Sequence, residues 1–355
     1  MPAISIDTFF ACSLMVILVL SAMASTSKLL YPHINNASDT NIGEMYREIS
    51  RYILLNPGKP SNWGQNGQTI PEVFGLAKAD SGSQYDLDID KVSRLNRENL
   101  YAVSYAQIFT ALKMSDISLK IEVKPIFEVT INLTATYISA NKTIYQFEIF
   151  TENQGVPIQA ELKCYVVAEN YLGLSFVNFS DGKTSLNITL SNNVKGPALF
   201  VVLARTVCNA KIVSFGVHPF AHNSSEPEPK STFLRLSPIN YSLDASLIYS
   251  EIDLSRAYAL TFNYFSTLTQ TSASNQSAAY NIPDFLDASP TLIVVTGWNS
   301  TLFFTEWTAY PQTPFQTGAD FAGSMSLSNV FTYTYIVTID YALYKCTAWL
   351  GGPKE

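Results

Sequence analysis

The sequence predicts a mainly β protein with a hydrophobic α-helix at its amino terminus. Three observations lead to this prediction: an uncharged apolar stretch near the start, strands with apolar residues at every second position, and short apolar segments bounded by turn residues. We expect a short helical layer followed by two antiparallel β-sandwiches. The regions are an N-terminal helix at 1–31, a neck and helical module at 32–126, a first sandwich at 127–221, a linker at 222–231 and a second sandwich at 232–355.

The apolar stretch has no charged residue from Thr8 to Ser27, a span of 20 positions. A helix of that length covers roughly 30 Å, which is enough to cross a bilayer. We expect the helix to be retained, because a secretory signal peptide usually has a basic start and a shorter apolar segment. Residues 22–24, Ala-Met-Ala, nevertheless match a signal cleavage site. Asp7 opens the stretch, and a carboxylate at membrane depth needs a partner.

The segment Ala3-Ile-Ser-Ile-Asp-Thr-Phe9 resembles the start of archaeal type IV pilins, the class III signal peptide proteins, with Asp7 in place of the family's glutamate. The resemblance implies that Asp7 pairs with the terminal amine of a neighbouring subunit and that the helices bundle in a filament core. The family's basic leader is missing, since only Met1 and Pro2 precede Ala3. Either the leader has been removed or the helix is an uncleaved anchor.

The composition indicates a folded protein and not a disordered chain. Charged residues make up only 14% of the chain and aromatic residues 13%, so ample apolar area is available to offset chain entropy. A net charge of −7 argues against partners such as nucleic acid or anionic lipid.

Asn-x-Ser/Thr triplets are frequent after the apolar stretch and predict N-linked glycans on a translocated surface. The acceptor residues are Asn36, Asn132, Asn141, Asn178, Asn187, Asn223, Asn240, Asn275 and Asn299.

Four cysteines leave the disulfide state open. Cys12 is expected to pack inside the apolar helix as a small hydrophobic residue. Cys164 and Cys208 fall in one β-rich segment and could form a disulfide, which would leave Cys346 unpaired. Buried free thiols are the equally weighted alternative.

Helical spacing predicts the module that follows the neck. A helix is expected from about Asn41 to a stop at 56–58, with an apolar face formed by Met45, Ile49, Tyr52 and Ile53. Asp90 is predicted to cap a short helix over 91–96. A further helix is predicted where apolar residues recur at Ala102, Tyr105, Ala106, Phe109 and Leu112.

This module is similar to one found in archaeal secreted and pilin-linked proteins. The resemblance rests on Leu54-Leu-Asn-Pro-Gly58, Asn62-Trp-Gly64, Phe74-Gly-Leu-Ala77 and Leu87-Asp-Ile-Asp-Lys-Val92. It implies a cell-surface location and no catalysis.

The strand pattern begins at 117–123, where Ile, Leu, Ile and Val alternate with polar residues. In the first sandwich, which we expect to be immunoglobulin-like, residues 158–166 alternate in the same way, 181–184 form a turn, and 196–205 are an almost wholly apolar core strand. Their order is similar to that of bacterial and archaeal surface Ig-like modules.

The second sandwich is predicted from three apolar segments. They are 291–296, 302–304 and 331–339, the last joined by a hairpin near Asp340 to 342–350. A strand from the region near Asp116 could complete this sandwich. The intervening Tyr310-Pro-Gln-Thr-Pro314 resembles a proline-bounded loop of archaeal surface proteins.

No catalytic, cofactor-binding or metal-binding motif is found. His218 and His222 are four residues apart but separated by Pro219, which opposes a zinc-binding helix and favours a surface or linker pair. Asp86, Asp88 and Asp90 start like a calcium loop, but its later positions do not match. The tryptophans, which we expect mainly in cores and cross-strand pairs, could alternatively form a sugar-binding platform. They are Trp63, Trp298, Trp307 and Trp349.

The sequence therefore predicts a non-enzymatic, glycosylated subunit of an extracellular archaeal pilus-like filament. Its partners would be copies of itself in a helical polymer and, before assembly, a membrane, with surface or glycan ligands left open. The main alternative is a single-copy, membrane-anchored adhesin or envelope protein. An anchored carbohydrate-active enzyme is a third class, for which no carboxylate pair is marked.

Overall fold

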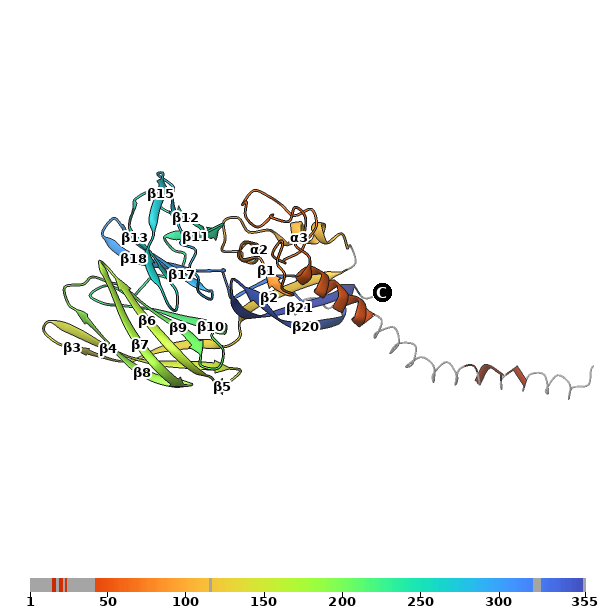
Figure 1. Cartoon of the computed structure of the whole chain (residues 1–355), viewed down its shortest axis with the longest axis horizontal. Coiled ribbons are helices and arrows are strands. Elements are labelled where there is room, and N and C mark those ends of the chain that lie inside the picture. Colours follow the sequence, from red (N-terminus) through yellow and green to blue (C-terminus); the bar gives the residue numbers. More distant parts are fainter. Residues whose placement is uncertain are drawn as a thin grey trace, which may run out of the picture. The chain divides into compact units, whose positions relative to one another are not determined.

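The computed structural model describes residues 15–16, 19–21, 23, 42–114, 117–321 and 327–353 (Figure 1). The chain divides into two compact units, Met1–Arg51 and Tyr52–Glu355. Asp7, Cys12, His33 and Asn36 lie outside the described residues. No helix formed by the residues that are described is both long and apolar enough to span a membrane.

Residues 42–114 contain three helical segments and the two-residue strand β1 (Asp86–Leu87). Residues 42–55 are helical, as expected, but Met45 and Tyr52 are each 47% exposed. The predicted apolar face is confirmed at Ile53, which is buried, and wrong at Met45 and Tyr52. The other buried residues of the helix are Tyr46, Ser50 and Leu54, so the buried face is rotated from the predicted one.

The two short helices are α2 (Ile89–Ser93) and α3 (Tyr105–Leu112). Asp88, not Asp90, caps α2: its Oδ1 accepts hydrogen bonds of 3.0 Å from the backbone amides of Asp90 and Lys91. Ser104 caps α3 in a capping box with Gln107.

Most of the chain is β structure, and its first two sheets share one core. One sheet has the order β3-β4-β5, with β8 also paired to β4, and the other has the order β10-β9-β6-β7. Phe147 of β4, Leu162 of β6 and Phe200 of β9 are fully buried in the same apolar cluster. The bounds are β3 (Glu128–Ile138), β4 (Lys142–Asn153), β5 (Val156–Pro157), β6 (Gln159–Ala168), β7 (Tyr171–Asp181), β8 (Lys183–Ser191), β9 (Ala198–Thr206) and β10 (Val213–Phe220).

Two further sheets form a second core, with the orders β11-β12-β16-β15 and β14-β13-β17-β18. Leu243, Ile293 and Phe304 are buried in its centre. The bounds are β11 (Leu234–Ile239), β12 (Ser242–Leu247), β13 (Ile252–Leu260), β14 (Phe265–Thr267), β15 (Thr269–Ala273), β16 (Ser277–Asn281), β17 (Thr291–Asn299) and β18 (Leu302–Tyr310).

The continuous apolar segment at 196–205 has a clear structural reason. In β9, Phe200 and Val202 enter the first core, while Val201 and Leu203 face a separate cluster that includes Val294 of β17. Both faces of the strand are thus covered, which removes the usual alternation with polar residues. The predicted core strand is confirmed, and its second face joins the sheet containing β9 to the sheet containing β17 within one compact unit.

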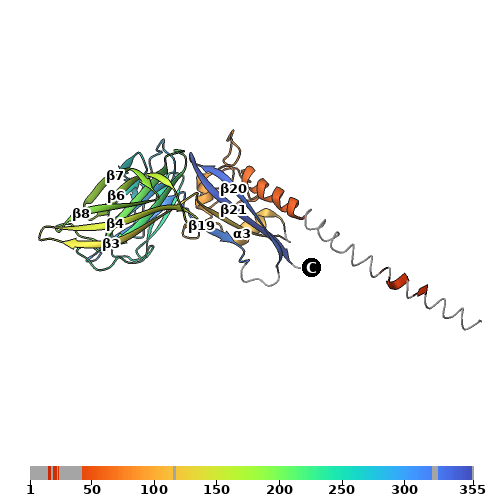
Figure 2. The same ribbon diagram turned by 90° about the horizontal axis from the view of Figure 1, so that it is seen from below.

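A fifth sheet, with the order β1-β20-β21-β2-β19, corrects the predicted second sandwich. The prediction that one sandwich occupies 232–355 is wrong, because the strands after Tyr310 pair with β1 and β2 (Figure 1). Figure 2 shows β19, β20 and β21 near one another. The hairpin near Asp340 and the alternation in β2 are confirmed, with Leu119, Ile121 and Val123 buried. The bounds are β1 (Asp86–Leu87), β2 (Ser118–Pro125), β19 (Phe315–Gly318), β20 (Leu327–Ile339) and β21 (Ala342–Pro353).

The proposed disulfide is not present, since Cys164 and Cys208 are both free thiols. Ala160 and Thr206 are register partners in the β6–β9 pair, so the two cysteines lie in opposite directions from that point. At 3.3 Å per residue, Cys164 alone is about 13 Å along β6 from it. Bonded cysteines have Cα atoms less than about 7 Å apart.

The segment at 222–231 contains no strand or helix but is attached at both ends. His222, expected at the surface or in a linker, is only 1% exposed, and its Nδ1 lies 2.9 Å from the Tyr145 hydroxyl. At the other end, the Glu306 carboxylate accepts hydrogen bonds from the backbone amides of Ser231 and Phe233 at 2.7 and 3.0 Å. Hydrogen bonds to buried groups thus restrain a segment whose composition is typical of a flexible linker.

Candidate functional site

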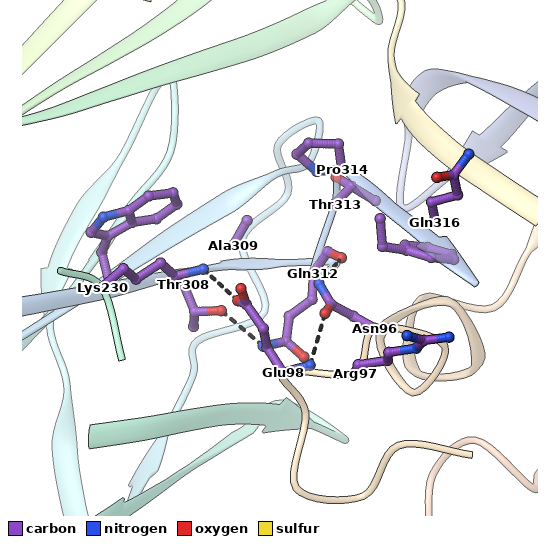
Figure 3. A pocket seen from close by; sticks show the side chains of 12 residues that line it. Asn96, Arg97, Glu98, Lys230, Thr308, Ala309, Gln312, Thr313, Pro314 and Gln316 are labelled. Carbon is purple, nitrogen blue, oxygen red and sulfur yellow. Dashed lines mark hydrogen bonds and ion pairs between the residues drawn. The ribbon is translucent and has the colours of Figure 1, made fainter. Parts of the chain in front are cut away.

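A cavity of about 400 Å³ that is lined by charged, polar and aromatic side chains is a candidate functional site (Figure 3). Its walls come from the turn after α2, from the segment before β11, and from β18, β19 and their connection. The lining residues are Asn96, Arg97, Glu98, Lys230, Trp307, Thr308, Ala309, Gln312, Thr313, Pro314, Phe315 and Gln316. The volume lies within the range of small-molecule sites.

Gln312 is central to the frame of the cavity and is almost completely buried. Its Nε2 donates to the Thr308 hydroxyl and to the backbone carbonyl of Leu236, both at 3.0 Å. Its Oε1 accepts a 2.7 Å hydrogen bond from Asn99 Nδ2, and its backbone carbonyl accepts one of 2.9 Å from Asn96 Nδ2. These bonds connect the turn after α2 to β18, so the walls are formed before any ligand arrives.

Arg235 fixes the backbone of the same turn. Its guanidinium donates to the carbonyl oxygens of Arg97 and Glu98 at 2.9 and 3.0 Å, and to that of Asn99 at 3.2 Å. The carbonyl oxygens of three successive residues therefore converge on one cation. This arrangement orients the side chains of Arg97 and Glu98 without using them.

Lys230 closes one end of the cavity. Its Nζ lies 2.6 Å from Glu98 Oε2 and 4.5 Å from the centre of the Trp307 ring. The ammonium group thus combines an ion pair with a cation–π contact. One face of the Trp307 ring is covered by this cation, and Phe215 meets the ring in an edge-on arrangement.

Arg97 and Gln316 both lie on the side of the cavity away from Lys230 in Figure 3, with their side chains apart from each other. Both residues are exposed. Among the described residues, neither the Arg97 guanidinium nor the Gln316 side-chain amide has a hydrogen-bond or ion-pair partner. The cavity therefore offers unused donors at one end and a neutralised ion pair at the other.

No family model matches this sequence, and comparison with curated proteins finds no match. Among solved structures, HBP35 of Porphyromonas gingivalis is similar with a TM-score of 0.19 and 12% identity. The match covers 52% of this chain and 64% of the HBP35 chain.

The tryptophans do not form one platform. Trp63 is fully buried, and its indole N–H donates to the Gly75 carbonyl at 3.0 Å. Trp298 and Trp349 each lie beneath a different lysine ammonium, that of Lys195 and that of Lys120. Only Trp307 lines the cavity.

The aspartates that resemble the start of a calcium loop have separate partners. Asp86 accepts a hydrogen bond from Ser81, and Asp88 caps α2. Asp90 Oδ1 accepts hydrogen bonds of 2.7 Å from the Tyr310 hydroxyl and from the backbone amide of Asn240. Within the described ranges, no cluster of three His, Cys, Asp or Glu residues is arranged to hold a metal ion.

The sequence did not indicate the cavity residues, apart from the proline-bounded loop at 310–314. Asn96, Arg97 and Glu98 are polar residues in an ordinary turn, and Lys230 lies in a segment resembling a linker. A signal was present only in the loop, where Gln312 stands between two prolines.

The predicted glycan acceptors within the described residues are mostly accessible. Asn178 lies on β7, and Asn299 is half-buried at the end of β17. The exposed residues are Asn132, Asn141, Asn187, Asn223, Asn240 and Asn275.

Asn223 is expected to carry less glycan than Asn275. The Asn223 Nδ2 donates to the carbonyl oxygens of Asn192 and Val194 at 2.9 and 3.1 Å, whereas Asn275 has no side-chain hydrogen bond to another described residue. N-glycosylation replaces one hydrogen of the amide, so one of the two Asn223 bonds would be lost. Glycopeptide mass spectrometry of the native protein measures both occupancies. Equal, near-complete occupancy would contradict the expectation.

Proposed function

We propose that the protein is a structural subunit of an extracellular, glycosylated, archaeal pilus-like filament. The N-terminal apolar helices would bundle in the filament core and the β domains would face outward. The observation that carries this proposal is the uncharged stretch from Thr8 to Ser27, opened by Asp7 and followed by a β-rich body. A polymer of such helices would be held by close packing inside and by domain contacts outside.

The β body supports an outward, load-bearing role. We infer that both sandwiches are immunoglobulin-like, because their strand orders match the A-B-E and G-F-C-C′ sheets of such domains, with β15 as strand D of the second. The cluster around Val201, Leu203 and Val294 covers apolar faces of a sheet from each sandwich. A large apolar contact of this kind favours a rigid body over two freely moving domains.

Asp7 would set the axial register by pairing with the terminal amine of a neighbouring subunit. Replacing Asp7 with Ala should abolish or disorder the filaments, because the buried amine would lose its counter-charge. Electron microscopy of filaments sheared from cells measures the effect. Asp7→Glu is the matched control and should assemble. Normal filaments from Asp7→Ala, with the protein confirmed at the surface, would discredit the role of Asp7.

The cavity favours a second candidate function, that of a single-copy, membrane-anchored adhesin. A preformed site of about 400 Å³ with unused donors is suited to recognition, which a purely structural subunit does not require. The two candidates differ in their assembly. Native protein extracted from the membrane as single copies, with no helical polymers on the cell surface, would favour the adhesin.

A further inference from the structure

We propose that the cavity bounded by Arg97, Lys230 and Gln312 binds an acidic sugar, namely a uronic acid unit of an oligosaccharide. This binding does not depend on filament assembly, since every lining residue belongs to one copy of the chain. Three properties of the cavity favour such a ligand: its charge, its combination of apolar and polar walls, and its preformed shape.

The charge of the cavity favours an anion. Glu98 and Lys230 neutralise each other in a 2.6 Å ion pair, which leaves Arg97 as the uncompensated charge of the lining. Arg235 adds a second cation behind the wall, where its guanidinium is bonded to backbone carbonyl oxygens. A guanidinium donates two parallel hydrogen bonds to a carboxylate, and this geometry gives both affinity and orientation. Arg97 is therefore the anchor for a carboxylate.

The walls suit a ring that has both apolar C–H groups and hydroxyls. Trp307, Pro314 and Phe315 contribute apolar surface, and Thr308 and Gln316 contribute a hydroxyl and an amide. In Figure 3 Gln316 and Arg97 lie apart on the side of the cavity away from Lys230, so a ligand that extends between them, such as one or two sugar rings, can contact both. Sites with mostly apolar walls and a few placed polar groups fix a small ligand in one orientation.

The shape favours a sugar over a peptide. An extended peptide usually adds to a free strand edge through backbone hydrogen bonds. Two edge strands reach this cavity, β18 with nine residues and β19 with four, and two of the β18 residues that line it, Thr308 and Ala309, are almost fully buried. The cavity volume is near the lower end of the range for ligand sites, and its frame is held by the Gln312 and Arg235 hydrogen bonds. One or two sugar rings match these limits better than a peptide segment.

The test is calorimetric titration of the purified full chain with a uronic acid disaccharide, the neutral disaccharide of the same linkage, and a peptide with a free terminal carboxylate. We expect saturable one-to-one binding of the acidic disaccharide and at least tenfold weaker binding of the other two. Arg97→Gln should lower the affinity for the acidic disaccharide by about tenfold or more, because charge-assisted hydrogen bonds are lost. Arg256→Gln is the matched control, since Arg256 is exposed on β13 and does not line the cavity.

A second measurement locates the bound sugar. With nitrogen-labelled tryptophan, the indole N–H resonance of Trp307 should shift on titration, and that of the buried Trp63 should not. Arg97 is exposed, so Arg97→Gln is expected to fold, and an unchanged spectrum without ligand checks this. The proposal is overturned if the acidic disaccharide does not bind, if the neutral sugar or the peptide binds as well, or if folded Arg97→Gln binds unchanged.

Discussion

Replacing Arg94 with alanine is expected to lower the free energy of unfolding by about 4 kcal/mol. The Arg94 side chain is almost fully buried, and its guanidinium donates to the carbonyl oxygens of Trp63, Asn66, Gly67 and Tyr101. Alanine would leave these four carbonyl oxygens without that donor and open a void against the Trp63 ring. Each buried polar group that loses its partner costs about 1–3 kcal/mol, reduced where water can enter.

Chemical denaturation followed by tryptophan fluorescence measures this loss. Arg97→Ala is the matched control, three residues away, and should change stability by less than about 0.5 kcal/mol because its side chain is exposed. If both substitutions have the same small effect, the carbonyl oxygens around Arg94 do not depend on its guanidinium.

The importance of Arg94 comes from the irregular loop that it supports. Residues 57–77 form no extended strand, so their carbonyl oxygens have few ladder partners. Lys91, also fully buried, donates from its Nζ to the carbonyl oxygens of Pro57 and Ala77 at 2.9 and 2.7 Å. Lys91 of α2 and Arg94, which directly follows the helix, thus replace the hydrogen bonds that a sheet would supply. Burial lowers the pKa of Arg94 to about 10, which is still well above neutral pH. The guanidinium therefore remains charged at neutral pH and keeps its hydrogen bonds to the loop.

The sequence predicted local structure well where one short pattern determines it. The alternation in β2, the apolar segment of β9 and the hairpin between β20 and β21 each depend on neighbouring residues. The choice of partner strand depends instead on the rest of the fold, since β2 pairs with β21 although both sandwiches lie between them in the chain. This pairing confirms the expectation that a strand from the region near Asp116 joins the strands after 331. No local pattern shows that these strands form a sheet of their own and not part of the second sandwich, which explains the error over 232–355.

The difference between local pattern and tertiary partner also explains why the sequence indicates neither the cavity nor the buried roles of Lys91 and Arg94. A buried lysine or arginine has the sequence appearance of a surface residue, and only the tertiary fold supplies its carbonyl partners. The sequence predicts Asp90 as a helix cap because it precedes a helical pattern. In the fold, Asp88 caps α2. The Asp90 carboxylate accepts a hydrogen bond from the hydroxyl of Tyr310, which belongs to β18 and is far from Asp90 in sequence.

Lowering the pH from 7.5 to 4.5 is expected to stabilise the protein through Asp90. Burial raises the pKa of Asp90 from 3.8 to about 6, and the hydrogen bonds from Tyr310 and Asn240 only partly oppose this rise. Burial, followed by repulsion from Asp284, likewise raises the pKa of Asp340 to about 6. Between pH 6 and 4 the folded chain therefore binds more protons than the unfolded chain. Stability rises as the pH falls through the folded pKa, and the gain is complete below the unfolded pKa.

The substitution Asp90→Asn isolates this effect. Both hydrogen bonds reach a single atom, Asp90 Oδ1, so the asparagine carbonyl oxygen can accept both while the buried charge is removed. The variant should be more stable than the wild type at pH 7.5, by up to about 3 kcal/mol for a pKa difference of two units. At pH 4.5 the two proteins should have similar stability, because the wild-type carboxyl is then neutral. Denaturation midpoints at the two pH values measure the difference, and a variant destabilised at pH 7.5 would show that the Asp90 charge supports the fold.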